Sequence, residues 1–169
     1  QKLGELYKLQ MHRKGAPVRE LATKAAVAYE QALKRAASVP QKTFILQSLA
    51  NTTFAAEQYE SAKAYATQLL EEPDRSPHLS GNPHVGHTIL GRLAIKDGEI
   101  ETAKGHLLDS VTWEGSTRMM PIKISMSLAH DLLEKEEWDI VTEYLQVCEE
   151  FWTSPRDVKK LDAWQAAVA

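Results

Sequence analysis

Residues 89–108 read ILGRLAIKDGEIETAKGHLL, and this stretch decides the fold class. Its apolar side chains recur at spacings of three and four on both sides of Asp97-Gly98, which is the period of an amphipathic helix. Glycine after an apolar helical run is typical of a helix C-terminus. Small residues at Gly91 and Ala103 let two helices approach closely. The stretch therefore predicts a helical hairpin with its turn at Gly98.

The same pattern recurs before and after this hairpin. Each copy has a leucine beside a small residue, then a turn residue, a large residue and a second small residue. The copies are Leu49-Ala50, Glu57, Tyr59 and Ala62; Leu90-Gly91, Gly98, Ile100 and Ala103; and Leu128-Ala129, Glu136, Trp138 and Val141. Ala62, Ala103 and Val141 are 41 and 38 positions apart, and a weaker first copy has Ala25 at 37 positions before Ala62. The chain is therefore interpreted as a helical repeat.

The pattern resembles the tetratricopeptide repeat, whose first helix carries Leu-Gly and whose second helix carries Ala at fixed spacing. The chain departs from that family in three ways: its repeat is longer than about 34 residues, the first-helix aromatic is replaced, and the turn glycine is kept only at Gly98. Residues 86–92 and 148–152 also resemble bacterial tetratricopeptide-like proteins of uncharacterised function.

The resemblance implies an all-α fold in a single domain over 1–169. We expect a right-handed superhelical stack of about four hairpins with a C-terminal capping helix. The expected repeat units are 3–38, 41–72, 83–111 and 121–152, with the last helix at 155–168. The apolar periodicity predicts helices at 3–13, 18–38, 41–57, 59–71, 83–97, 100–109, 121–135, 138–151 and 155–168.

Composition excludes several classes of protein. The chain is 43% hydrophobic with a formal net charge of -3, so it can bury a core and has no basic patch for nucleic acid. We expect no membrane span, because no apolar run reaches about 18 residues. The chain begins at Gln1 rather than methionine, which we interpret as removal of a signal peptide or of a further domain. The expected compartment is the cytoplasm or, after signal-peptide removal, the periplasm or exterior.

The sequence predicts neither an enzyme nor a cofactor. Serines lie outside any nucleophile motif, and the one cysteine, Cys148, falls where the repeat family places a small buried residue. His84 and His87 are three apart, so they could share a helical face and bind a metal with a third ligand from among His78, His106 and His130. Packing is the favoured interpretation of these histidines, and no metal site is predicted.

A protein-binding scaffold is the predicted function, with a peptide or partner protein held in the concave groove that the first helices line. The alternative is a non-catalytic accessory or oligomerisation domain, including a homodimer. The loop with Trp113 and Arg118 is a second candidate surface, because Trp and Arg are common in binding hot spots. The outward positions of the first helices are predicted to be Gln47, Asn51, Phe54, Thr88, Arg92, Lys96, Met126, His130 and Glu134.

Overall fold

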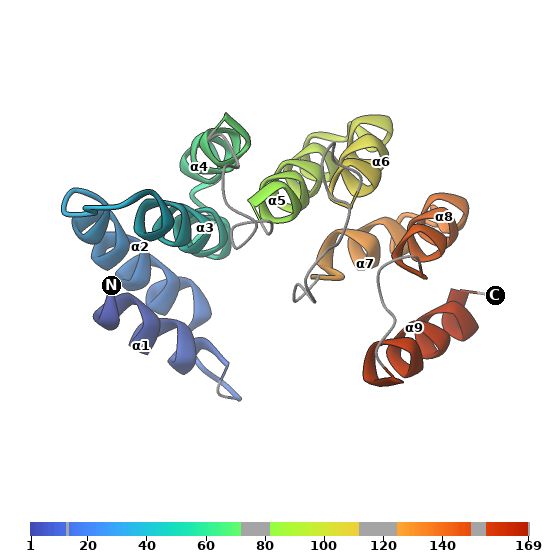
Figure 1. Ribbon diagram of the computed structural model, residues 1–169, viewed down its shortest axis with the longest axis horizontal. Helices are drawn as coiled ribbons and strands as arrows, with labels where there is room; N and C mark the ends of the chain where they lie inside the picture. Colours follow the sequence, from blue (N-terminus) through green and yellow to red (C-terminus); the bar gives the residue numbers. More distant parts are fainter. Residues whose placement is uncertain (13, 72–81, 112–124, 150–154, 169) are drawn as a thin grey trace.

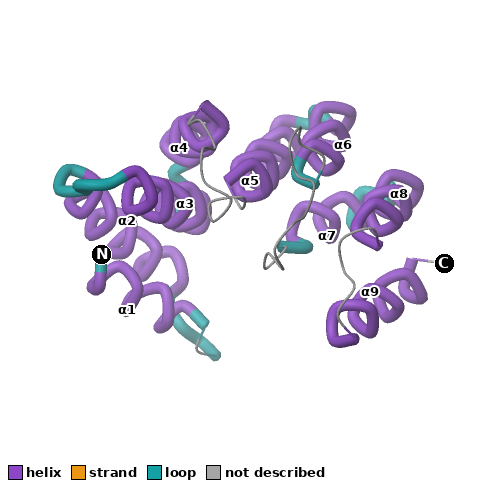
Figure 2. Tube along the Cα trace, viewed as in Figure 1, coloured by secondary structure: helices purple, strands orange, loops and turns teal. Residues whose placement is uncertain are grey.

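The computed structural model of the chain describes residues 1–12, 14–71, 82–111, 125–149 and 155–168. These residues form helices and their connections, and no strand occurs among them (Figure 2). The predicted all-α class is therefore confirmed. The helices are α1 Lys2–Met11, α2 Val18–Leu33, α3 Val39–Ala55, α4 Tyr59–Glu71, α5 Asn82–Asp97, α6 Ile100–Asp109, α7 Ser127–Leu133, α8 Trp138–Glu149 and α9 Pro155–Val168.

The helices follow one another along an arc (Figure 1). Helices α3, α5 and α7 form its inner row, α4, α6 and α8 form its outer row, and α1 and α9 lie at its two ends. Within the inner row, α3 packs against α5 and α5 against α7. Each inner helix therefore contacts the next one, and side chains on this row can interact across consecutive hairpins.

Three connections, α3–α4, α5–α6 and α7–α8, share one turn geometry. In each, the first helix is followed by a residue with positive φ: Glu57 at 61°, Gly98 at 81° and Glu136 at 63°. The N–H of that residue donates to a carbonyl three positions earlier, and the next N–H donates to one five positions earlier. This pair of hydrogen bonds is the Schellman motif, which satisfies the last carbonyls of a helix.

Small residues lie at the helix contacts, as the repeat pattern predicts. Ala62, Ala66 and Ala103 are fully buried, and Gly91 is buried as well. A Cβ on Gly91 would lie 2.4 Å from Leu128 Cδ2 and 3.1 Å from His106 Cβ. The contact with His106 on α6 confirms that Gly91 admits the partner helix of its own hairpin. The structure adds a second close neighbour that was not predicted, Leu128 on α7 in the next hairpin.

Several predicted bounds are wrong. Helix α2 ends at Leu33, where 38 was expected, because the N–H groups of Arg35 and Ala36 bond to carbonyls three positions back and tighten the chain out of the α-helix. Helix α3 includes Pro40, whose missing N–H is tolerated in a first turn. Helix α7 occupies only Ser127–Leu133 of the expected 121–135, with 121–124 outside the described residues.

The described core consists of three clusters along the arc. One cluster lies between α2 and α3, and one lies among α3, α4 and α5. The third contains residues of α5, α6, α7, α8 and α9. Leu161 of α9 is buried in the last cluster, and Trp164 packs against it. Across the described residues, no helix combines the length and the apolar character needed to cross a bilayer.

Candidate functional site

A row of contacting side chains crosses the inner helices α3, α5 and α7. The Arg92 guanidinium of α5 lies over the Phe54 ring of α3, 4.5 Å from its centroid. On its other side, Arg92 Nε donates to Asp131 Oδ2 of α7 over 2.6 Å. The charged group of Arg92 therefore has an aromatic face on one side and a carboxylate on the other, both from neighbouring hairpins.

The row extends to Tyr59, the first residue of α4. Lys96 Nζ lies 4.5 Å from the centroid of the Tyr59 ring, and Tyr59 meets Phe54 edge to face with ring centroids 5.8 Å apart. Cation–π contacts of this kind each contribute about 0.5–1 kcal/mol at exposed sites. We call Phe54, Tyr59, Arg92, Lys96 and Asp131 the inter-hairpin row.

The sequence correctly placed Phe54, Arg92 and Lys96 on one side of the stack, but it missed two members of the row. Asp131 is next to the predicted His130, and Tyr59 had been treated only as a packing position. Of the two predicted cations, Arg92 already has a carboxylate partner, because its Nε lies 2.6 Å from Asp131 Oδ2. Lys96 remains exposed.

Other predicted groove residues have partners outside this row. Asn51 is exposed, and its amide donates to the Gln47 carbonyl one turn earlier over 2.8 Å. His130 is exposed, with Nδ1 3.6 Å from Glu134 Oε1. Met126 was predicted to face outward, but it is half-buried and packs against the C-terminal core.

Thr88 was also predicted to face outward, but it is only 5% exposed and is therefore buried. The second candidate surface, with Trp113 and Arg118, lies outside the described residues.

His84 is a structural residue of α5. It is 2% exposed, its Nε2 accepts from the Ser125 N–H over 2.8 Å, and its Nδ1 lies 3.3 Å from the Ser110 carbonyl oxygen. Since Nε2 is an acceptor, Nδ1 carries the proton and donates to Ser110. Burial lowers the pKa of His84 to about 4, so the ring is neutral near pH 7. It connects the end of α6 to the segment before α7.

His87 faces α6 and meets a second histidine there. His87 Nδ1 and His106 Nδ1 lie 3.0 Å apart, and both rings are half-buried. The carboxylate of Asp109, one turn after His106 on α6, belongs to the same cluster. His84 and His87 therefore do not share a site: both nitrogens of His84 have backbone partners, as the favoured packing interpretation implies, whereas His87 pairs with His106.

Cys148 is fully buried, which agrees with the prediction of a buried thiol. Burial raises its pKa to about 12, so the thiol keeps its proton at neutral pH. Because the thiolate is the reactive form of cysteine, this side chain is poorly suited to nucleophilic chemistry.

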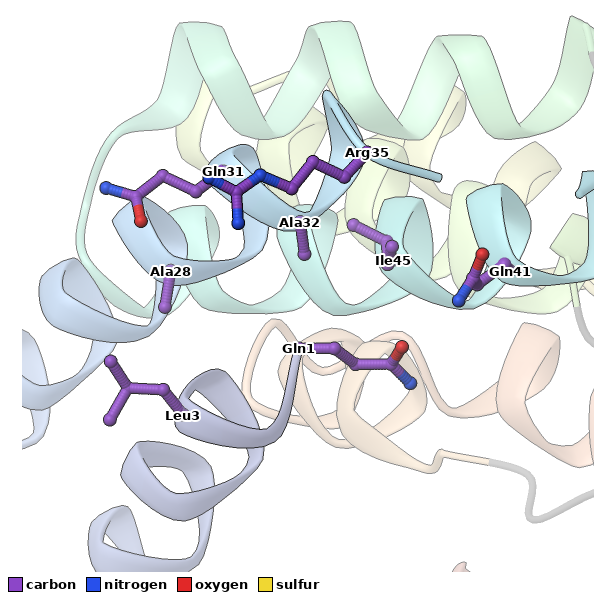
Figure 3. Close-up of a pocket in the computed structure, with 8 residues that line it drawn as sticks. All are labelled: Gln1, Leu3, Ala28, Gln31, Ala32, Arg35, Gln41 and Ile45. Atoms are coloured by element: carbon purple, nitrogen blue, oxygen red, sulfur yellow. The ribbon is translucent and has the colours of Figure 1, made fainter. Parts of the chain in front are cut away.

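A pocket of about 280 Å³ lies between α1, α2 and α3 (Figure 3). Its wall combines the amides of Gln1, Gln31 and Gln41 with Arg35 and the apolar Ala32 and Ile45. The volume is at the lower edge of the roughly 300–1,000 Å³ typical of small-molecule sites.

Comparison of the chain with protein-family models, with curated proteins and with solved structures found no match.

Proposed function

We propose that this chain is a non-catalytic interaction scaffold of tetratricopeptide type, which binds a peptide or partner protein across α3, α5 and α7. The recurrence of small residues and of one turn geometry through three hairpins supports a repeat architecture. In such architectures, the inner helices form an extended binding surface. The Phe54, Arg92 and Lys96 side chains lie on these helices.

The observation that carries the proposal is the inter-hairpin row itself. Its contacts link three consecutive inner helices and hold the side chains in one arrangement before any ligand binds. A surface ordered in advance loses less side-chain entropy on binding. Aromatic and arginine side chains are also the residue types enriched in binding hot spots.

The chemistry of the row favours a partner with an acidic side chain beside an apolar one. Lys96 is the exposed cation of the row, and Tyr59 and Phe54 are half-buried aromatic faces next to it. Arg92 contributes a flat guanidinium surface rather than an unbalanced charge, because Asp131 is bound to it. An acidic group of the partner would therefore contact Lys96.

A photo-crosslinking residue at Asn51, which is exposed on α3, tests the surface in the cells that produce the protein. The control places the same residue at Lys63, which is exposed on α4 in the outer row. We expect a discrete crosslinked species from position 51 and not from position 63. Lys96→Glu should remove it, whereas Lys63→Glu should leave it. Equal crosslinking from both positions would reject the inner surface.

The second candidate function is an accessory or oligomerisation domain, and one observation favours it. Leu3, Leu6 and Leu9 on α1 are 53%, 50% and 69% exposed. Successive spacings of three keep these leucines within about 120° of one another around a helix. Light scattering after size exclusion, over a range of concentrations, would show self-association. Leu6→Glu should abolish it if this face forms the contact.

A further inference from the structure

A second polar cluster lies inside the α5–α6 hairpin and is separate from the inter-hairpin row. It consists of His87 on α5 with His106 and Asp109 on α6. One ligand-type atom from each residue lies within 4.8 Å of the other two. His106 and Asp109 are three positions apart on a helix, so both side chains project from the same face toward His87.

The spacing of these atoms is close to what a tetrahedral cation requires. With Zn–N bonds of about 2.0–2.1 Å, two ligand nitrogens lie about 3.3–3.4 Å apart, by tetrahedral geometry. The Nδ1 atoms of His87 and His106 are 3.0 Å apart, so the rings need to separate by only a few tenths of an ångström. Asp109 is exposed, and rotation of its side chain can bring an oxygen to the same centre.

The protonation states suit metal binding. Burial lowers the pKa of both His87 and His106, and the nearby His106 lowers that of His87 further. Both rings are therefore neutral at pH 7, which is the form that coordinates a metal. At 3.0 Å, one Nδ1 must carry the proton and donate it to the other. For both Nδ1 atoms to bind a cation, the donor ring takes its other neutral tautomer, with the proton on Nε2, so that both Nδ1 lone pairs face the ion.

We propose that His87, His106 and Asp109 form a binding site for a divalent cation of the zinc class, which joins α5 to α6. Two imidazoles and a carboxylate are ligands that zinc accepts in proteins. Three protein ligands leave the fourth tetrahedral position for water. The bound ion fixes the hairpin directly, because its ligands come from both helices.

The neighbouring hairpin shows what this position looks like without such a site. Forty-one residues earlier, the places of His87, His106 and Asp109 are occupied by Leu46, Tyr65 and Gln68. Leu46 is fully buried in an apolar cluster, and Tyr65 packs against that cluster. Packing of the hairpin therefore does not require histidines, and the ligand set is specific to α5–α6.

A second group of possible ligands among the described residues is His130 and Asp131 on α7 with Glu134 at its C-cap. It is a weaker candidate, because Asp131 is already bound to Arg92 and the other two side chains are exposed. It serves instead as an internal control for nonspecific binding to surface histidines.

The test uses the full chain, stripped of metal with a chelator. We expect calorimetric titration with zinc chloride to give one ion per chain, and Co²⁺ to give the visible absorption of a tetrahedral site. The variant H87L/H106Y/D109Q installs the residues of the neighbouring hairpin. Its affinity for zinc should fall by more than roughly 10- to 100-fold. That range is the loss expected when only a residue that supports a metal ligand, rather than the ligand itself, is removed. His130→Ala should bind like the wild type.

Thermal unfolding provides an independent readout. Zinc should raise the melting temperature of the wild type, because a ligand that binds only the folded state stabilises it. It should not raise that of the triple variant, whose melting temperature in chelator reports its own fold. Asp109→Gln changes an exposed side chain, so it remains informative if the triple variant does not fold. No zinc binding by the wild type, or equal binding by Asp109→Gln, would overturn the proposal.

Discussion

The hairpins α3–α4 and α5–α6 share a common frame, by which we mean their turn geometry and the small residues at their helix contact. They differ in the other side chains that lie between the two helices. Both turns have a left-handed residue with the same two backbone hydrogen bonds, and both second helices bury an alanine at the contact, Ala62 and Ala103. Between the helices, the first hairpin has Leu46 and Tyr65, where the second has His87 and His106. The frame therefore depends on the turn and the small residues, and the remaining positions can carry other chemistry.

A second pair of positions shows the same contrast. Thr43 and His84 are 41 residues apart and both are buried, at 1% and 2% exposure. Threonine does not titrate, whereas His84 is a base with two backbone partners, the Ser125 N–H and the Ser110 carbonyl. The comparison predicts that the α5–α6 hairpin responds to acid and that the α3–α4 hairpin does not.

The largest effect is expected from acid. Because burial lowers the pKa of His84 to about 4, the unfolded chain, with a histidine pKa near 6.5, takes up a proton before the folded chain does. His84 therefore contributes its full stability above pH 6.5, and this is lost as the pH falls toward 4. The difference between the two pKa values corresponds to about 3 kcal/mol in the free energy of unfolding. Denaturant unfolding between pH 7 and pH 4, in chelator, measures it.

His84→Thr, which installs the residue of the neighbouring hairpin, is the matched variant. It should be less stable at pH 7, because the Ser125 and Ser110 hydrogen bonds are lost, but its stability should change less with pH. Some dependence will remain, since burial also lowers the pKa of His87 and His106. Parallel pH profiles for the wild type and the variant would show that His84 is not the acid-sensitive group.

The same contrast shows what the sequence could predict. Helix bounds at Tyr59–Glu71 and Ile100–Asp109 were predicted correctly, because the repeat pattern places each helix directly after a turn position, which is marked by glycine only at Gly98. The left-handed Glu57 and Glu136 could not be predicted from residue type, since glutamate rarely has positive φ; only alignment with Gly98 points to them.

The candidate site was predicted less completely than the fold. Periodicity within α5 placed Arg92 at the surface, but its partner Asp131 is 39 residues away, and its contact depends on how α7 packs against α5. The pairing of His87 with His106 depends in the same way on the packing of two helices. Helical periodicity gives the face on which a residue lies and leaves its tertiary partner undetermined.

The second-largest effect on stability is expected at Gly91, where α5 approaches α7 of the next hairpin. Gly91 occupies the place that Ala50 has in α3–α4. Gly91→Leu should lower the free energy of unfolding by about 1–3 kcal/mol, because even a Cβ would lie 2.4 Å from Leu128 Cδ2. Gly105→Ala is the control: its Cβ would have no neighbour within 4 Å, and alanine favours an exposed helix by about 0.5–1 kcal/mol. Equal melting temperatures for Gly91→Leu and the wild type would contradict the described packing of α5 against α7.

The smallest changes in stability are expected from substitutions at the turn residue with positive φ, and they should have opposite signs in the two hairpins. Gly98→Glu places a side chain at a φ of 81° and should lower stability by about 1 kcal/mol. Steric crowding does not cause this loss of stability, since a Cβ on Gly98 would have no neighbour within 4 Å. Glu57→Gly relieves the same strain at a φ of 61° and should raise stability, by somewhat less than 1 kcal/mol. Part of the gain is offset by loss of the exposed ion pair between Glu57 and Arg19, 3.2 Å apart. Two changes of the same sign would mean that the turns are not equivalent, and that the shared frame of α3–α4 and α5–α6 is only superficial.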